Sequence, residues 1–195
     1  MLTAEQREKL FQMKIIKNVD AKALGISPSC LSYYAKRGVL ERMAPGIYLN
    51  KKQELDVPAQ WEELVGIIMS IPQGVVTGIP ALSLYDITDE FVRRYWIAVP
   101  NNTSTGNHPL VKILRLRNHS LGVTKMKLGE VEIPIYDLER TIVDAFRFQT
   151  LEIGIKALQM AFQLPFGKRP DIHKLSEYSY ELHYNLSPYI MALTT

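Results

Sequence analysis

The chain has 195 residues, of which 47% are hydrophobic and 22% are charged, with 23 Lys and Arg against 20 Asp and Glu. This is a globular composition, which excludes a disordered or collagen-like chain. A single cysteine, Cys30, excludes an internal disulfide and a cysteine-based zinc site. The apolar runs are far shorter than the roughly 20 residues of a membrane span. The charged N-terminus has no signal-peptide core, so we expect a cytoplasmic protein with no membrane partner.

Positive charge is concentrated in two segments. Residues 1–56 carry ten Lys or Arg and six Asp or Glu, a net charge of +4, whereas residues 57–195 have a net charge of −1. Within this second part, residues 93–127 contain seven basic side chains and no acidic one. Two basic segments on a near-neutral background favour an anionic partner, nucleic acid first. An ordinary solvated basic face is the alternative.

The first 55 residues have the element order of a winged helix-turn-helix. Thr3 and Gln6 form a capping-box pattern that predicts a helix over 4–13. A brief strand at 15–16 and a very short helix over 21–24 follow, and Gly25 stops that helix. Ser27 begins a third helix that runs to about residue 37. Two short strands, 39–42 and 47–49, then flank a Pro-Gly turn, for which we expect a slightly longer or bulged loop.

The polar segment 50–58 predicts a boundary, so we assign residues 1–55 to a winged helix-turn-helix DNA-binding domain and residues 56–195 to an α+β domain. The second domain opens with a helix whose buried stripe has the spacing i, i+3, i+4, i+7. Apolar alternation then predicts a small, mostly antiparallel sheet with flanking helices. Its expected strands are 75–76, 95–99, 111–116, 124–128 and 132–136, and its expected helices are 77–85, one capped by Asp137, 152–163 and 171–183.

The third helix is the best candidate for a site, because its outward positions are small, polar and rich in hydroxyl groups. Such a helix can enter a major groove about 12 Å wide and contact base edges or phosphates. Leu31 and Tyr34 are expected to face inward. Cations on the neighbouring elements would hold the backbone phosphates. The predicted DNA-binding residues are Lys22, Ser27, Ser29, Ser32, Tyr33, Lys36, Arg37 and Arg42. A winged helix that serves protein contacts is the alternative.

The predicted sheet carries a second basic surface. It would extend a DNA footprint or meet RNA or an acidic protein, whereas the structural alternative is a solvated sheet edge that resists aggregation. The residues of this second basic surface are Arg93, Arg94, Lys112, Arg115, Arg117, Lys125 and Lys127.

Nothing in the sequence predicts an enzyme, a cofactor or a metal site. Cys30 has no base nearby in the sequence, and no two histidines have the spacing of a helical ligand pair. Phosphate-binding loops and nucleophile elbows are absent from the sequence. The acidic residues near positions 86–90 and 137–144 are interpreted as solubility and capping features. The scattered histidines, interpreted as surface or hydrogen-bonded side chains, are His108, His119, His173 and His183.

Several segments together resemble the AbiEi-type antitoxin family. Residues 19–48 contain ALGI at 23–26, KRGVLER at 36–42 and GIY at 46–48, and they look like the N-terminal domain of that family. The segments ALSLYDIT at 81–88 and DLERTIVD at 137–144 are similar to parts of its C-terminal antitoxin domain. The resemblance covers about residues 1–150. Pro45 is a departure, since family members often have a basic residue just before the wing glycine.

The resemblance implies an antitoxin of a bacterial type IV toxin–antitoxin system, of the kind tied to abortive infection and phage defence. Such an antitoxin represses its own promoter by binding inverted repeats in double-stranded DNA. It counters a nucleotidyltransferase-like toxin without a stable complex, and its C-terminal domain contributes to that role.

Three alternatives remain open on the sequence. The chain could be a winged-helix transcriptional regulator with a ligand- or protein-binding C-terminal domain and no toxin partner. It could be a nuclease or an RNA-modifying enzyme that uses the second basic surface. It could also be a module that holds a toxin directly.

Overall fold

The computed structural model describes residues 2–53, 56–106 and 109–194. The chain folds into two compact units. The first unit comprises Met1–Pro72 with Lys127–Ile133, and the second comprises Gln73–Met126 with Pro134–Thr195. The protein is α+β, as the sequence predicts, and each unit combines helices with strands.

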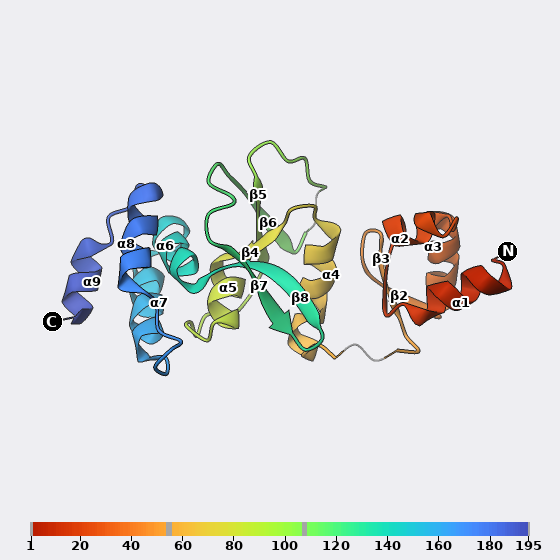
Figure 1. Cartoon of the computed structure of the whole chain (residues 1–195), viewed down its shortest axis with the longest axis horizontal. Helices are drawn as coiled ribbons and strands as arrows, with labels where there is room; N and C mark the ends of the chain where they lie inside the picture. The colour runs from red at the N-terminus through yellow and green to blue at the C-terminus, as the bar shows by residue number, and fades with distance from the viewer. Residues whose placement is uncertain (1, 54–55, 107–108, 195) are drawn as a thin grey trace. The chain divides into compact units, whose positions relative to one another are not determined.

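The first unit begins with helices that alternate with short strands (Figure 1). Its strands form an antiparallel sheet in the order β1-β3-β2. A 3-10 turn at Ala59–Trp61 leads into α4, and the predicted stripe of Trp61, Leu64, Val65 and Ile68 is buried. The elements are α1 (Ala4–Gln12), β1 (Ile15–Lys17), α2 (Asn18–Ala23), α3 (Pro28–Lys36), β2 (Leu40–Ala44), β3 (Ile47–Asn50) and α4 (Glu62–Ser70).

Local signals in the sequence fix the ends of these elements. The Thr3 hydroxyl accepts from the Gln6 backbone N–H at 3.1 Å, while the Gln6 side chain accepts from the Thr3 N–H at 3.0 Å, which completes the predicted capping box. Gly25 and Gly38 follow α2 and α3 with φ of +71° and +72°, a conformation that glycine adopts without a Cβ penalty. The hairpin register shifts between Arg42 and Ala44, an irregularity of the kind expected at this turn.

Apolar side chains from these helices and strands form the core of the unit. Leu10, Ile16 and Leu31 have no exposed surface, and Ile26 lies beside them. Burying one such aliphatic side chain stabilises a fold by about 1.5–3 kcal/mol. The stability of the short helices in this unit therefore depends on the shared core rather than on intrinsic helix propensity.

The second unit contains most of a sheet whose strand order is β6-β5-β4-β8-β7, while Lys127–Ile133, which holds the end of β7 and the start of β8, belongs to the first unit. Short helices precede and follow its strands, and the chain ends in further helices (Figure 1). Helix α9 was not among the predicted elements. The elements are β4 (Val75–Thr77), α5 (Gly78–Leu84), β5 (Tyr95–Pro100), β6 (Val111–Leu116), β7 (Val123–Leu128), β8 (Val131–Tyr136), α6 (Leu138–Phe148), α7 (Leu151–Gln163), α8 (Ile172–Glu181) and α9 (Ser187–Thr194).

This sheet is mixed, so the prediction of a mostly antiparallel sheet is wrong. Strands β4 and β5 are antiparallel, but β4 pairs with β8 and β5 pairs with β6 in parallel. Tyr95, the first residue of β5, pairs with Val111, the first residue of β6. The two strands therefore run in the same direction, and the chain between them crosses back to the end of the sheet at which β5 begins. Alternation of apolar and polar residues identifies a strand, but it does not determine whether that strand runs parallel or antiparallel to its neighbour.

Helices α5 to α9 build the core of the second unit. Ile142, Leu158 and Leu175 are fully buried, from α6, α7 and α8 respectively. Figure 1 shows α6, α7 and α8 side by side at this end of the chain. Gly154 of α7 allows a close approach, since a Cβ there would lie 2.8 Å from the ring of Phe146. In the part of the chain that the structure describes, no helix has the length and apolar character of a membrane span.

Candidate nucleic-acid interface

Contacts made by the turn at Gly25 set the direction of α3. The Ile26 backbone N–H donates to the Ala21 carbonyl at 2.9 Å, which closes the turn after α2. The Gln6 side chain donates to the Leu24 carbonyl at 3.0 Å, so the amide that completes the α1 cap also holds this turn. The angle between α2 and α3 therefore depends on α1 as well as on the turn itself.

One face of α3 packs inward as predicted. Leu31 is fully buried, and Tyr34 is half-buried with its ring edge-on to Phe11 at a centroid distance of 5.5 Å. Cys30 is also half-buried and packs against the same core. These contacts leave the opposite face of the helix available.

That opposite face holds most of the side chains that the sequence assigned to it. Ser27, Ser29, Tyr33 and Lys36 are exposed. Ser32 differs, because it is half-buried and its hydroxyl lies 3.2 Å from the Tyr48 hydroxyl of β3. Ser32 therefore connects α3 to β3 of the sheet, although the sequence placed it on the outer face of α3.

The N-terminal end of α3 has no side-chain cap among the described residues. Ser27 is the N-cap residue, but its hydroxyl lies 2.8 Å from the Ser29 hydroxyl and makes no capping bond. Pro28, at the first helical position, brings no N–H group. This end of the helix presents two hydroxyl groups and the positive end of the helix dipole, a combination that suits a phosphate or a base edge.

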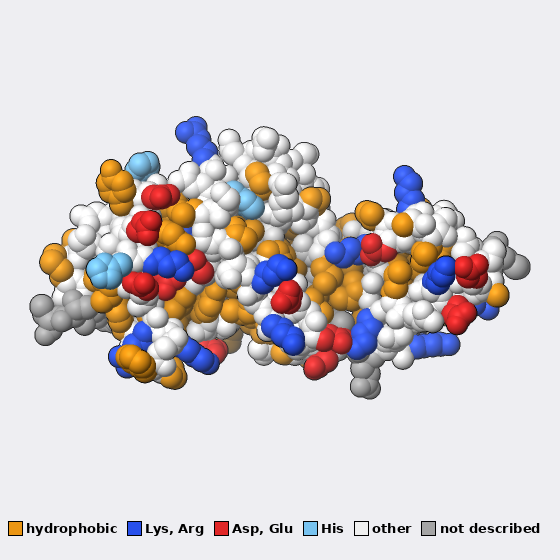
Figure 2. All heavy atoms as spheres, viewed as in Figure 1, with side chains coloured by type: hydrophobic (Ala, Val, Ile, Leu, Met, Phe, Trp, Pro, Cys, Tyr) orange, Lys and Arg blue, Asp and Glu red, His pale blue; other side chains and the backbone are white. Residues whose placement is uncertain are grey.

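The predicted phosphate-binding cations lie exposed at the surface of the first unit. Among the described residues, no ion pair involves Lys22, Lys36, Arg37 or Arg42. The Arg37 guanidinium lies 4.9 Å from the centre of the Tyr33 ring, which orders it without neutralising its charge. Figure 2 shows Lys and Arg side chains spread over the visible face of this unit.

Other cations of the same unit are paired. Lys9 lies 2.7 Å from Glu5, Lys14 lies 2.6 Å from Glu130, and the Lys51–Glu41 distance is 3.8 Å. The four cations that the sequence assigned to DNA binding are therefore among the basic residues of this unit that form no ion pair with a described residue.

The structure does not bring the seven cations of the second basic surface together. Strands β6 and β7 are the two edges of the five-stranded sheet, with β5, β4 and β8 between them. Lys112 and Arg115 lie on β6, and Lys125 and Lys127 lie on β7. Cations on both edges match the structural alternative of edge protection.

Part of this set lines a groove of about 540 Å³ on the second unit. Arg93 and Arg94 meet Lys112 there, and the Lys112 ammonium lies 3.5 Å from the centre of the Trp96 ring. Phe91, on the same groove, is 86% exposed. Arg115 and Arg117 line a different groove, beside Arg147 of α6.

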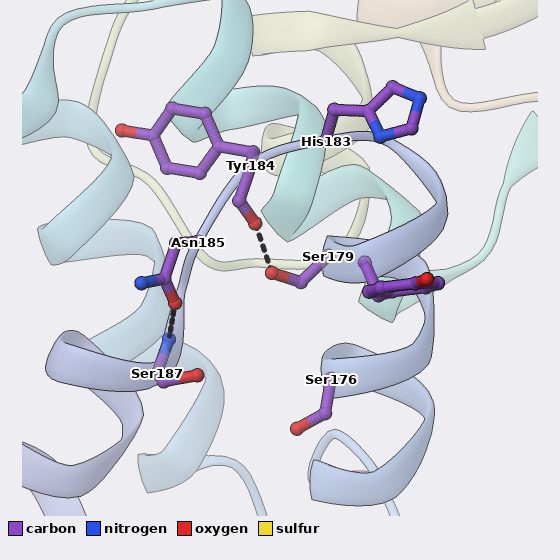
Figure 3. Close-up of a pocket in the computed structure, with 7 residues that line it drawn as sticks. Ser176, Ser179, His183, Tyr184, Asn185 and Ser187 are labelled. Carbon is purple, nitrogen blue, oxygen red and sulfur yellow. Dashed lines mark hydrogen bonds between the residues drawn. The ribbon is translucent and has the colours of Figure 1, made fainter.

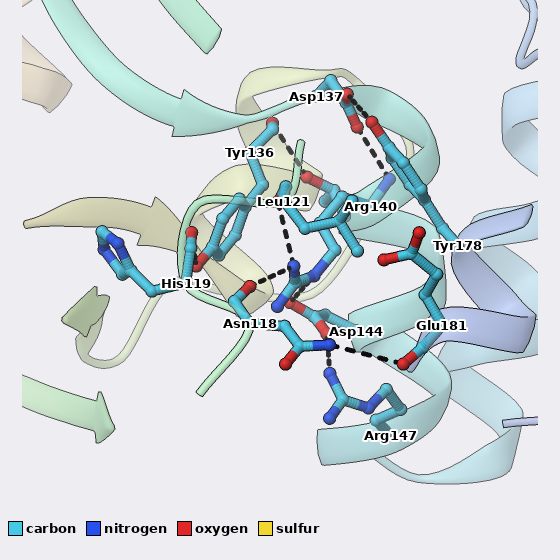
Figure 4. A network of polar contacts seen from close by, with 11 residues as sticks. Asn118, His119, Leu121, Tyr136, Asp137, Arg140, Asp144, Arg147, Tyr178 and Glu181 are labelled. Atoms are coloured by element: carbon cyan, nitrogen blue, oxygen red, sulfur yellow. Dashed lines mark hydrogen bonds and ion pairs between the residues drawn. The ribbon is translucent and has the colours of Figure 1, made fainter. Parts of the chain in front are cut away.

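The acidic segment at the start of α6 is a buried network, so the interpretation of its acids as solubility features is wrong for two of them. Asp137 is the predicted cap and accepts from the Arg140 N–H at 2.9 Å. Glu139 is nearly buried and accepts from the Lys174 ammonium at 3.0 Å. Asp144 is 1% exposed and lies between the guanidiniums of Arg140 and Arg147 (Figure 4). Each buried carboxylate therefore has a cationic partner.

Arg140 and Arg147 are the notable residues that sequence reasoning did not single out. The i, i+4 spacing of Arg140 and Asp144 and the i, i+3 spacing of Asp144 and Arg147 were visible in the sequence. Such spacing is typical of exposed helical ion pairs, and only the tertiary structure shows that this one is buried.

A third hollow, of about 370 Å³, lies between the end of α8 and the start of α9 (Figure 3). The Ser179 hydroxyl contacts the Tyr184 carbonyl and accepts from the Leu186 N–H. The Asn185 side chain accepts from the Ser187 N–H at 3.1 Å. These polar groups close the α8–α9 turn, so we assign the hollow a structural role.

The histidines that the structure describes belong to no candidate metal cluster. Within residues 2–53, 56–106 and 109–194, no cluster of His, Cys, Asp and Glu could hold a metal ion. His119 is half-buried, and burial lowers its pKa below the ordinary value. His173 and His183 are exposed, and His108 lies outside the described residues.

Comparison with known families matches the N-terminal segment. The family model described as "Transcriptional regulator, AbiEi antitoxin" matches residues 6–51. This match confirms the resemblance to that family for the segment that holds most of α1, all of α2 and α3, and the hairpin. A comparison with curated proteins gives no match.

Proposed function

We propose that this chain is an antitoxin of a bacterial type IV toxin–antitoxin system that represses its own promoter. It binds double-stranded DNA with inverted repeats and counters a nucleotidyltransferase-like toxin without a stable complex. It acts in the cytoplasm, in abortive infection, and catalyses no reaction. Residues 1–55 form the DNA-binding domain and residues 56–195 the antitoxin domain.

The DNA-binding domain is proposed to be a winged helix-turn-helix. Helices α2 and α3 flank the glycine turn, and the β2–β3 hairpin follows them in the order of a wing. Helix α3 enters the major groove with its N-terminal hydroxyl groups toward the bases. The phosphates are contacted by Lys22, Lys36, Arg37 and, from the wing, Arg42. The observation that carries this proposal is the exposed face of α3 with cations that have no acidic partner among the described residues.

DNA binding is tested by a gel shift on the chain's own promoter with the variant K36E/R37E. Loss of two phosphate contacts and gain of two repelling charges should weaken binding by more than about tenfold near 0.1 M salt. The matched control is K168E/R169E, which reverses the same pair of residue types at an exposed site beyond α7. Equal shifts for both variants would overturn the assignment of α3.

The antitoxin role is tested by co-expression with the proposed nucleotidyltransferase-like toxin, which is to be sought in the reading frame adjacent to that of this chain. The toxin alone should arrest growth, and this chain should restore it. K36E/R37E should restore growth equally well when both genes have foreign promoters, because the proposal separates repression from antitoxicity. Continued arrest would contradict the antitoxin role.

A second candidate is a transcriptional regulator with a ligand-binding C-terminal domain and no toxin partner. The observation that favours it is the groove lined by Arg115, Arg117 and Arg147 in the second unit. Absence of a toxin gene, together with DNA binding that responds to a ligand, would select this candidate.

A further inference from the structure

A groove of about 500 Å³ in the second unit, here called the arginine groove, is lined by guanidinium groups. Arg115 and Arg117 come from β6 and the residue that follows it, and Arg140 and Arg147 come from α6. Glu181, at the end of α8, is the one carboxylate among the described residues of the lining. Arginines from two separate elements thus converge on a space of the size that small-molecule sites occupy.

Arg140 forms the floor of the arginine groove, since it lines the groove but has no exposed surface. Its Nε donates to Asp144 at 2.9 Å, and its Nη1 donates to the carbonyls of Asn118 and Leu121, both at 2.9 Å (Figure 4). Its Nη2 is buried and has no hydrogen-bond partner among the described residues. Buried donors normally have partners, whereas this guanidinium lies over the Tyr136 ring, 4.3 Å from the ring centre, so its positive charge is not fully matched by hydrogen-bond acceptors beneath the groove.

The charge of the arginine groove is only partly balanced. Asp144 accepts from both Arg140 and Arg147, so one carboxylate serves two guanidiniums. Arg115 contacts the Thr105 hydroxyl at 3.4 Å, and neither Arg115 nor Arg117 forms an ion pair with a described residue. The groove therefore holds excess positive charge next to a low-dielectric floor, where an anion is bound more strongly than at an open surface.

We propose that the arginine groove binds a phosphate-bearing small molecule, with the phosphate oxygens held by Arg115, Arg117 and Arg147 above the buried guanidinium of Arg140. A phosphate offers several oxygens and up to two negative charges, which suits several planar forks better than a single carboxylate does. The volume exceeds that of a free phosphate ion, so the remaining space accommodates the organic part of a phosphate ester.

The geometry also prepares the site for binding. Arg147 is held by Asp144 at 2.6 Å, and its guanidinium lies 4.7 Å from the centre of the Phe148 ring. Arg140 is fixed by its three hydrogen bonds. Two of the four guanidiniums are thus ordered before the ligand arrives, which lowers the entropic cost of binding.

The test is isothermal titration calorimetry of the full chain with inorganic phosphate, pyrophosphate and AMP at constant ionic strength. We expect saturable binding in the millimolar range or tighter for at least one of these anions. The variant R115Q/R117Q should bind at least about tenfold more weakly, because it removes two charged donors. The matched control R93Q/R94Q removes the same charge and residue types from the other groove and should bind like the native chain.

Tighter binding of AMP than of phosphate would identify a nucleotide-like ester as the ligand class, and equal binding would identify the free anion; both support the site. No binding of any of the three anions would overturn the proposal. Equal weakening by R115Q/R117Q and R93Q/R94Q would overturn it too, since it would reveal a diffuse charge effect. Thermal melts of both variants serve as the check that each keeps the native fold.

This site does not depend on DNA binding by α3. The variant K36E/R37E should lose promoter binding and keep phosphate binding. The variant R115Q/R117Q should keep promoter binding and lose phosphate binding. Failure of either proposal is therefore visible separately from failure of the other.

Discussion

The guanidinium of Arg140 and the carboxylate of Asp144 lie 2.9 Å apart, and their side chains are 0% and 1% exposed. An ion pair this buried is costly to break, because removal of one charge leaves the other without compensation in a low-dielectric site. The pair sits one helical turn into α6, between the sheet and the helices that follow it. It links the loop at 118–121 to α6 through the carbonyls that Arg140 binds.

Substitution of Asp144 by Asn should destabilise the protein strongly. Asn keeps the size of the side chain but removes the charge that two guanidiniums share, so we expect a loss of about 3–5 kcal/mol in the free energy of unfolding. Urea denaturation followed by circular dichroism measures it. Asp89→Asn is the control, because Asp89 pairs with Lys156 at an exposed site and should change stability little. Similar losses for both variants would contradict this account.

Substitution of Gly122 by Ala should also destabilise the second unit. Gly122 has φ of +73°, and a Cβ there would lie 2.8 Å from the Arg140 Cβ. The left-handed conformation and the displaced arginine together should cost more than about 1–3 kcal/mol, the usual cost of strained backbone alone.

Gly167→Ala separates the two contributions to the Gly122 effect. Gly167 has φ of +89°, but no described atom lies within 4 Å of the position that a Cβ would take, so only the backbone strain applies there. Urea denaturation of both variants should show the larger loss for Gly122→Ala. Equal losses would mean that contact with Arg140 is unimportant.

The salt dependence of promoter binding should report the phosphate contacts that we propose for α3. We expect K36Q and R37Q each to reduce the slope of log affinity against log salt concentration by about 1. K168Q provides the control, since Lys168 is exposed in the second unit. Fluorescence anisotropy over a salt series gives the slopes, and unchanged slopes for K36Q and R37Q would exclude these residues from the contact.

Stability should fall as the pH is lowered from about 7 to 5, in part through His119. Burial lowers the pKa of His119, so the unfolded chain binds a proton more readily than the folded chain does. The stabilisation from neutral His119 is therefore complete above its unfolded pKa of about 6.5 and is lost as the pH falls through and below that value.

Replacement of His119 by Gln tests this origin of the pH dependence. The difference in melting temperature between pH 7 and pH 5 should be smaller in His119→Gln than in the native chain. The exposed His173 provides the comparison, and His173→Gln should leave the difference unchanged. A native pH dependence in His119→Gln would contradict the role of this residue.

Local sequence determined most of the elements of this protein. The capping box at Thr3, the glycines after α2 and α3 and the cap at Asp137 act over a few residues, so their effects are readable without the fold. The inward Leu31 and the buried stripe around Leu64 follow from helical periodicity in the same way. The outer face of α3 was identified for the same reason, with Ser32 as the exception because its Tyr48 partner lies on another element.

Tertiary structure alone decided the strand directions of the larger sheet, the separation of β6 from β7 and the burial of Asp144. Each of these depends on contacts between segments far apart in the chain, and no local pattern encodes the path of a connection. A charged helix spacing looks the same in the sequence whether water or a packed core surrounds it. The arginine groove likewise exists only because β6 and α6 are placed beside each other, since its charges come from elements that the chain order keeps apart.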